Sequence, residues 1–190
     1  MDEARISNTA LSAVWIATEY NNQNDPATFL AAQAEETGPG PVGWWSFDEG
    51  YGTTANDGSG SMNHGMITGA DWQDESMCVS GKCLYFDGLD GTYVDANAPD
   101  NMTTFTSCLW LKAVSFTNND SDAIIDLASK GGLLRLNNSG QIYIDVPAGV
   151  DSYAISSESL SLNEWHFVCG VHNSVGTNPK IFIDGNDKSS

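Results

Sequence analysis

The densest group of side chains able to do chemistry lies in one loop, residues 56–63, which reads Asn-Asp-Gly-Ser-Gly-Ser-Met-Asn. Carboxylate, amide and hydroxyl oxygens alternate there with two glycines, which allow backbone carbonyls to turn inward. Calcium takes about six to eight such oxygens. The composition makes this loop a candidate calcium site, while its spacing differs from that of an EF-hand. Asx-turns that hold no ion are the alternative.

Paired carboxylates are the next chemistry to consider, because glycoside hydrolases need two acids about 5–10 Å apart. Asp122 and Asp126 lie four residues apart, but we expect one of them in a turn, and Asp145 stands alone among isoleucines. No strand pattern places acids at alternate positions in the manner of Glu-x-Asp-x-Glu. We interpret these acids as solvated strand ends.

The three histidines are His64, His166 and His172. His64 lies in a Gly/Asn loop, and His166 alternates with aromatic neighbours and so faces the other side of its strand. No serine or cysteine occupies a G-x-S-x-G elbow. We therefore expect no nucleophile triad, no catalytic residue and no enzymatic activity.

The four cysteines form two groups. Cys78 and Cys83 flank a turn, and their spacing is too wide for a zinc knuckle, so a disulfide that closes a hairpin is possible in an oxidising compartment. Cys108 and Cys169 lie inside apolar strand patterns. We expect free buried thiols there, with a cross-strand bridge as the alternative.

Composition excludes some partners. The 190 residues include 25 acidic and 7 basic side chains, a formal net charge of −18. Phosphate binding needs clustered lysine and arginine, so we expect no nucleic-acid partner and no anionic membrane. Hydrophobic residues make up 41% of the chain, enough for a core. No apolar run approaches the ~18 residues of a spanning helix, so we expect no membrane insertion.

The start of the chain predicts a short strand and a helix. Residues 2–6 are extended in character, residues 7–9 offer N-caps, and Leu11, Val14 and Trp15 recur at helical spacing. Asparagines and Pro26 end that helix. Residues 27–41 read as a linker, because their Pro and Gly residues deny any regular element.

From Val42 onward the pattern is all-β. Short apolar runs alternate with Gly, Asn, Asp and Ser turns, among them residues 137–140 and 184–185. So many strands without helices between them predict a two-sheet antiparallel sandwich. The predicted strands are residues 43–48, 83–87, 93–94, 104–112, 123–127, 133–137, 141–145, 152–155, 165–172 and 180–183.

Several motifs in this part of the chain resemble a known family, the laminin-G-like, concanavalin A-like jelly-roll modules. The motifs follow one another in the family's order over about 145 residues, which makes the set specific although each motif alone is weak. They lie at residues 43–50, 52–57 and 63–65, at 84–88 with 93–94, at 105–112, at 164–168 and at 181–185.

The head of the chain resembles the other end of the same module. The resemblance implies that residues 1–26 are the closing strand and helix of a preceding module, 27–41 a linker, and 42–190 a jelly-roll without its C-terminal strands. Residues 2–7 are then expected to pair beside residues 45–48, as a closing strand would. The chain begins without the basic start and apolar stretch of a secretory signal, which fits a piece of a longer chain.

The resemblance also assigns the candidate calcium ligands. Family members often hold Ca²⁺ where the opening loop meets the closing strand. Carried onto this chain, that site would use Asp57, the carbonyls near Asn63, and Asp2 as the acid of the closing strand.

The aromatic residues suggest where a ligand would bind. Trp44 and Trp45 must face opposite sides of one strand, and we expect Trp110 and Trp165 in the core. The looser candidates for ligand contact are Tyr51, Tyr93 and Tyr153.

The resemblance implies a non-catalytic recognition module of an extracellular or cell-surface multidomain protein. Its partner would be a glycan or an extracellular protein, with tandem neighbouring domains in the parent chain. An accessory domain of a polysaccharide-degrading enzyme and a structural spacer in a repeat array are the alternatives.

Overall fold

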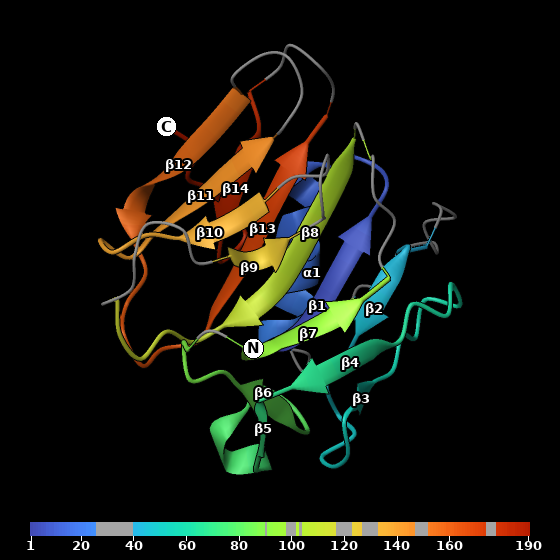
Figure 1. Ribbon diagram of the computed structural model, residues 1–190. Coiled ribbons are helices and arrows are strands. Elements are labelled where there is room, and N and C mark those ends of the chain that lie inside the picture. The colour runs from blue at the N-terminus through green and yellow to red at the C-terminus, as the bar shows by residue number, and fades with distance from the viewer. Residues whose placement is uncertain are drawn as a thin grey trace.

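The computed structural model describes residues 1–25, 40–89, 91–97, 102, 104–116, 123–126, 133–146, 152–173 and 178–190. Most of the predicted linker and Asp122 lie outside the described residues. The described part is a β-sandwich of antiparallel strands with one α-helix, which confirms the predicted fold class (Figure 1). Within that part, no helix combines the length and hydropathy needed to cross a bilayer.

The first layer is a six-stranded sheet with the order β15-β14-β13-β8-β1-β2. Its strands are β1 (Asp2–Ser7), β2 (Gly43–Trp45), β8 (Phe105–Leu111), β13 (His166–His172), β14 (Lys180–Ile183) and β15 (Asn186–Asp187).

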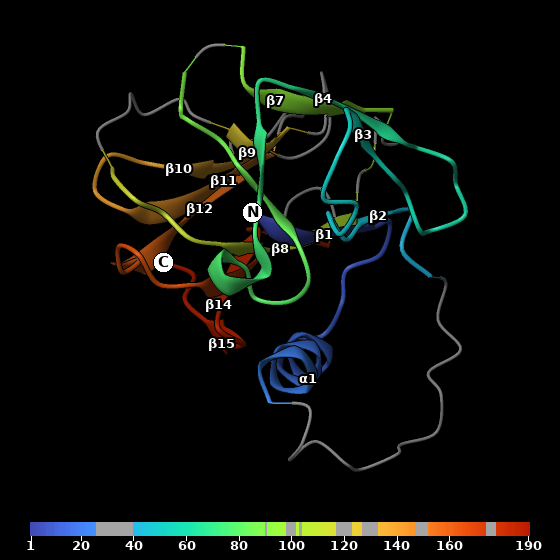
Figure 2. The ribbon, with the colours of Figure 1, turned by 90° about the horizontal axis from the view of Figure 1, so that it is seen from below.

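The second layer contains a four-stranded sheet with the order β12-β11-β10-β9 and a three-stranded sheet with the order β3-β4-β7 (Figure 2). The strands of these sheets are β3 (Thr54–Ala55), β4 (Gly65–Thr68), β7 (Tyr93–Ala96), β9 (Ala123–Asp126), β10 (Leu133–Leu136), β11 (Gln141–Val146) and β12 (Ser152–Ser159). A further pair consists of β5 (Asp71–Gln73) and β6 (Cys83–Tyr85), which flank a 3₁₀ turn at Glu75–Met77.

The core fills the space between the two layers. Leu109 and Val168 of the six-stranded sheet pack in one buried cluster with Leu134 and Ile144 of the four-stranded sheet. Gly170 allows this close approach, because a β-carbon there would lie 2.9 Å from the Ile144 side chain. Along β11, buried residues alternate with half-buried ones, because one face of the strand packs on the core and the other faces solvent.

Strand β1 lies inside the six-stranded sheet. Ala4 pairs with Trp45 of β2, so the strand meets the predicted range 45–48 only at Trp45 and otherwise pairs with residues 43 and 44, while Arg5 also pairs with Cys108 of β8. The strand therefore fills a gap between β8 and β2 rather than extending an edge. The division of the chain into parts of two modules stays a prediction.

The helix α1 (Ala13–Asn24) covers the outer face of the six-stranded sheet (Figure 2). It begins after Ser12, whose hydroxyl accepts the Trp15 N–H, so the predicted caps at residues 7–9 are wrong. The predicted apolar stripe is right at Leu11 and Trp15, which pack against the buried cluster, but wrong at Val14, which is 77% exposed while Ile16 is fully buried. Residues 7–9 do not cap the helix because β1 extends to Ser7 and Thr9 is held by Thr106 of β8.

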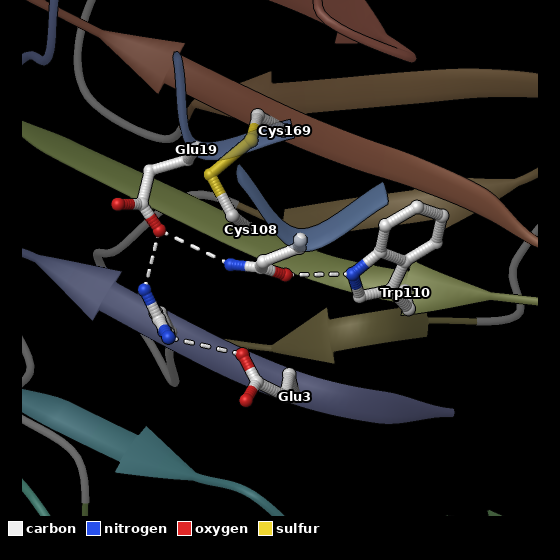
Figure 3. Close-up of polar contacts among 7 residues, drawn as sticks. Glu3, Glu19, Cys108, Trp110 and Cys169 are labelled. Atoms are coloured by element: carbon white, nitrogen blue, oxygen red, sulfur yellow. Dashed lines mark hydrogen bonds and ion pairs between the residues drawn. A yellow bond between two sulfur atoms is a disulfide. The ribbon is translucent and has the colours of Figure 1, made fainter. Parts of the chain in front are cut away.

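Polar contacts fix the helix on the sheet (Figure 3). Arg5 of β1 forms ion pairs with Glu3 and with Glu19 of α1. Gln23 donates to the same Glu19 carboxylate and accepts a hydrogen bond from the Trp110 indole. These contacts explain why the buried side of the helix carries polar residues.

All four cysteines are in disulfides, Cys78–Cys83 and Cys108–Cys169. The expectation of free thiols at Cys108 and Cys169 is wrong, because the two residues lie directly opposite each other on β8 and β13. Their α-carbons are 4.2 Å apart, within reach of a cross-strand bridge.

Trp44 and Trp45 lie on opposite faces of β2, as the alternation predicts. Trp45 is buried in the core, and Trp44 on the other face lies under the Arg5 guanidinium. Trp110 is buried beneath α1. The expectation of Trp165 in the core is wrong: it precedes the first residue of β13 and is only partly buried, with the Lys112 ammonium over its ring.

Candidate functional site

The predicted calcium loop is organised around the Asp57 carboxylate. Its Oδ1 accepts the N–H groups of Trp44 at 3.0 Å and Ser59 at 2.8 Å. Its Oδ2 accepts the Ser59 hydroxyl at 2.8 Å and the Asn63 N–H at 2.9 Å. Burial works to raise the pKa of Asp57, but these hydrogen bonds outweigh it and leave the pKa below its ordinary value.

Asn63 ties the same loop to β2. Its side-chain amide donates to the Val42 carbonyl at 3.0 Å, and its own carbonyl accepts the Trp45 indole N–H at 2.9 Å. The N–H of Asp57 donates in turn to Nδ1 of His64 at 3.1 Å. The loop is thus an Asx-turn held by its own polar groups, the alternative that the sequence left open.

Asp2, the third predicted calcium ligand, contacts a different loop. Its Oδ2 accepts the N–H groups of Val79 and Ser80, in the loop closed by the Cys78–Cys83 disulfide. Asp2 is 1% exposed, and burial raises its pKa to about 6 against the effect of these hydrogen bonds.

The structure brings Asp57 and Asn63 together and leaves Asp2 with other partners. An ionised carboxylate has about four acceptor positions, and those of Asp57 are taken by protein donors. In this arrangement the residues do not fit a calcium ion. Within the described ranges, no three His, Cys, Asp or Glu side chains are grouped to hold a metal. Calcium binding here stays a prediction that requires the loop to rearrange.

A His–Asp pair links β13 to the turn after β14. Nδ1 of His166 lies 2.8 Å from Oδ2 of Asp184, and its Nε2 accepts the backbone N–H of Ser161 at 3.2 Å. In a nucleophilic triad that second nitrogen would face a hydroxyl or thiol. Here it is occupied by a backbone amide, so the pair acts as a structural link.

The outer face of the four-stranded sheet carries a different set of side chains. The strand register places Arg135 opposite Tyr143, and Tyr143 opposite Ile155. In the next row Asp145 lies opposite Tyr153. Directly paired residues point to the same side of a sheet, and the residues between them are buried in the core. These five side chains therefore share the face that points away from the core.

A groove of about 470 Å³ opens on this face. Its described lining consists of Arg135, Asn137, Asn138, Tyr143, Asp145 and Ile155. The rings of Tyr143 and Tyr153 stack almost in parallel, with centroids 5.5 Å apart and planes at 11°. Tyr153 is 54% exposed. The groove thus combines the Tyr143 ring, amides and one charge of each sign, with the Tyr153 ring stacked beside it, which suits a polar ligand with an apolar ring face.

The surroundings of Tyr143 favour the protonated form of its hydroxyl further than in a free tyrosine. Burial raises the pKa of Tyr143, the charges of Asp145 and Tyr153 add to the rise, and Arg135 opposes it. At neutral pH the hydroxyl therefore remains available as a hydrogen-bond donor.

Sequence reasoning singled out Tyr153 as a contact candidate but missed Arg135 and Tyr143. The other two tyrosine candidates are exposed on other parts of the surface: Tyr51 is 81% exposed in a loop, and Tyr93 is 48% exposed on β7. The turn at residues 137–140 was the available signal, since a hairpin of that length places Arg135 beside Tyr143.

Comparison with known proteins agrees with this architecture. A family model described as the concanavalin A-like lectin/glucanases superfamily matches residues 87–190, more than half of the chain. No curated protein and no solved structure matches the chain. The matched segment includes β8 to β14 and thus every residue of the groove. The chain therefore belongs to the concanavalin A-like lectin/glucanase superfamily.

Proposed function

We propose that this protein is a non-catalytic glycan-recognition module that binds sugar on the outer face of β10, β11 and β12. The observation that carries the proposal is the stacked pair Tyr143 and Tyr153 beside the groove. Sugar rings present an apolar face that packs on aromatic rings, while their hydroxyls need donors and acceptors. Arg135, Asn138 and Asp145 supply such groups in the groove.

The layout of the fold supports the choice of this face. The outer face of the six-stranded sheet is covered by α1, whose Ile16 packs on Cys108 and Phe167. The outer face of the four-stranded sheet instead bears the stacked tyrosines and the groove. Its ligand would contact side chains held on strands, whose positions the sheet fixes.

The proposal also places this module in a secreted or cell-surface protein. Two disulfides fit an oxidising compartment and thus a secreted or cell-surface parent chain. A parent with tandem modules would present several such grooves and gain affinity by multivalency.

One observation favours a second candidate, a glycosidase-related activity. Asp126 and Asp145 both pair with Leu133, from opposite sides, so they share the outer face two strand spacings apart. That spacing is about 10 Å between backbones, near the carboxylate separation of inverting glycosidases. Against it, Asp126 is not among the residues that line the groove.

The experiment is a glycan array probed with the wild-type chain and with Tyr153→Ala. We expect binding that the variant loses by about tenfold, because stacking on an exposed ring contributes on the order of 1 kcal/mol or more. Tyr93→Ala is the matched control, since Tyr93 is similarly exposed on the three-stranded sheet. Equal loss in both variants, or no binding to any glycan, would contradict the proposal.

A hydrolase screen on the bound glycans separates the second candidate. Binding without turnover supports recognition. Turnover that Asp145→Asn abolishes, while binding persists, would establish the glycosidase instead.

A further inference from the structure

The groove contains a cation, Arg135, that has no partner among the residues that the structure describes. Arg135 makes no ion pair or hydrogen bond with any described residue, and its Nε is buried without a partner. The other described basic residues are engaged: Arg5 with Glu3 and Glu19, Lys82 with Asp74, Lys112 with the Met77 carbonyl, Lys180 with Asp187, and Lys188 with Glu158.

This lack of a partner is notable in so acidic a chain. Acidic residues outnumber basic ones 25 to 7, and Asp145 lies on the neighbouring strand of the same face. Yet no described carboxylate pairs with Arg135. A guanidinium carries a permanent charge and five donors, and its planar fork matches a carboxylate in a two-bond arrangement. An anionic group on the ligand would satisfy it.

The side chains in and beside the groove limit which anionic ligands can bind next to Arg135. The Tyr143–Tyr153 stack offers ring faces, and Asp145 offers an acceptor for ligand hydroxyls. Asp145 also repels a second negative charge close to the first. The net charge of −18 repels any ligand with a charge on every unit, such as a sulfated or phosphate polymer. The surface therefore suits one carboxylate among neutral sugars.

We propose that the groove selects a saccharide with an isolated uronic acid residue, whose carboxylate binds Arg135 while an adjacent sugar ring packs on the tyrosine stack. This inference rests on the proposed glycan-binding function and adds the chemical class of the ligand. Arg135 is then the residue that determines specificity, and the two tyrosines supply binding that is independent of charge.

The experiment uses an array on which each uronic-acid saccharide is printed beside its neutral methyl ester. For the wild-type chain we expect the acid to bind about tenfold more tightly than the ester, as a charge-assisted hydrogen bond would give. Arg135→Gln is expected to remove this preference and leave ester binding unchanged. Lys180→Gln is the matched control, because it removes the same charge from β14, in the other sheet.

The outcomes distinguish the two proposals. Equal binding of acid and ester, lost in Tyr153→Ala, overturns the uronic-acid inference and leaves glycan recognition standing. No binding to any saccharide overturns both. Binding of a glutamate-rich peptide that depends on Arg135, with no bound saccharide, would identify an acidic protein partner and overturn both as well. Thermal unfolding of each variant checks that it is folded.

Discussion

The indole Nε1 of Trp110 donates a 2.7 Å hydrogen bond to the side-chain oxygen of Gln23, which ties the middle of the six-stranded sheet to the last turn of α1 (Figure 3). Trp110 is 4% exposed, so water cannot replace Gln23 without the helix moving. We predict that Gln23→Ala lowers the free energy of unfolding by about 1–2 kcal/mol, the cost of a buried donor left without a partner.

Urea denaturation measures this loss. Asn22→Ala is the control, because Asn22 is the exposed neighbour on the same helix and its replacement should change stability by less than about 0.5 kcal/mol. Similar losses in the two variants would show that the contact between helix and sheet does not depend on the indole.

The two disulfides are predicted to differ in what they contribute. Cys108–Cys169 closes a separation of 61 residues and Cys78–Cys83 one of 5. A cross-link restricts the unfolded chain more when its loop is longer. Cys108–Cys169 should therefore add about 4 kcal/mol to the free energy of unfolding, and Cys78–Cys83 about 2 kcal/mol. Denaturation of the two serine double variants, C108S/C169S and C78S/C83S, tests this order. A larger loss in the second variant would refute it.

Asp2 is predicted to make stability depend on pH. Its folded pKa of about 6 lies above the ordinary value of 3.8, so the folded chain keeps a proton that the unfolded chain has released between these limits. The free energy of unfolding therefore falls as pH rises through this window, by about 2–3 kcal/mol from this group. Asp2→Asn keeps an acceptor for Val79 and Ser80 but cannot ionise.

Urea midpoints of wild type and Asp2→Asn at pH 4, 5, 6 and 7 provide the measurement. As pH rises from 4 to 6, the urea midpoint of the wild type should fall relative to that of Asp2→Asn. Above pH 6 the difference between the two midpoints should stay constant. Parallel curves would mean that Asp2 titrates normally.

Asp57 is predicted to stabilise its loop without an ion. Asp57→Ala leaves the N–H groups of Trp44 and Asn63 without acceptors, so we expect a loss of about 2–3 kcal/mol in the presence of EDTA. Asp57→Asn keeps part of the acceptor set and should lose less. A normal stability of Asp57→Ala in EDTA, with a calcium-dependent rise in the wild type alone, would instead support the predicted calcium site.

The sequence predicted the longer strands, whose pattern is local, but missed the short strands β3, β4, β5 and β15, which have two to four residues each. Alternation in residues 141–145 and the turn at 137–140 define β11 and its hairpin partner without any distant contact. The turn at Asp184-Gly185 likewise joins β14 to β15. Resemblance to the family added the pairing of residues 2–7 with Trp45.

What the sequence did not reveal depends on distant contacts. Val14 and Ile16 are similar apolar residues in one helix, and only the position of Cys108 and Phe167 beneath it decides that Ile16 is buried. The second partner of β1, strand β8, is about a hundred residues away. The stack of Tyr153 on Tyr143 depends on the register between β11 and β12, which the alternation within either strand does not determine.

The most direct test of glycan recognition is an NMR titration of the wild-type chain with a saccharide that binds on the array. We predict that amide shifts change along β10, β11 and β12, centred on Tyr143 and Tyr153, and remain unchanged in the loop at residues 56–63. Changes confined to that loop, or to the three-stranded sheet around Tyr93, would contradict this account.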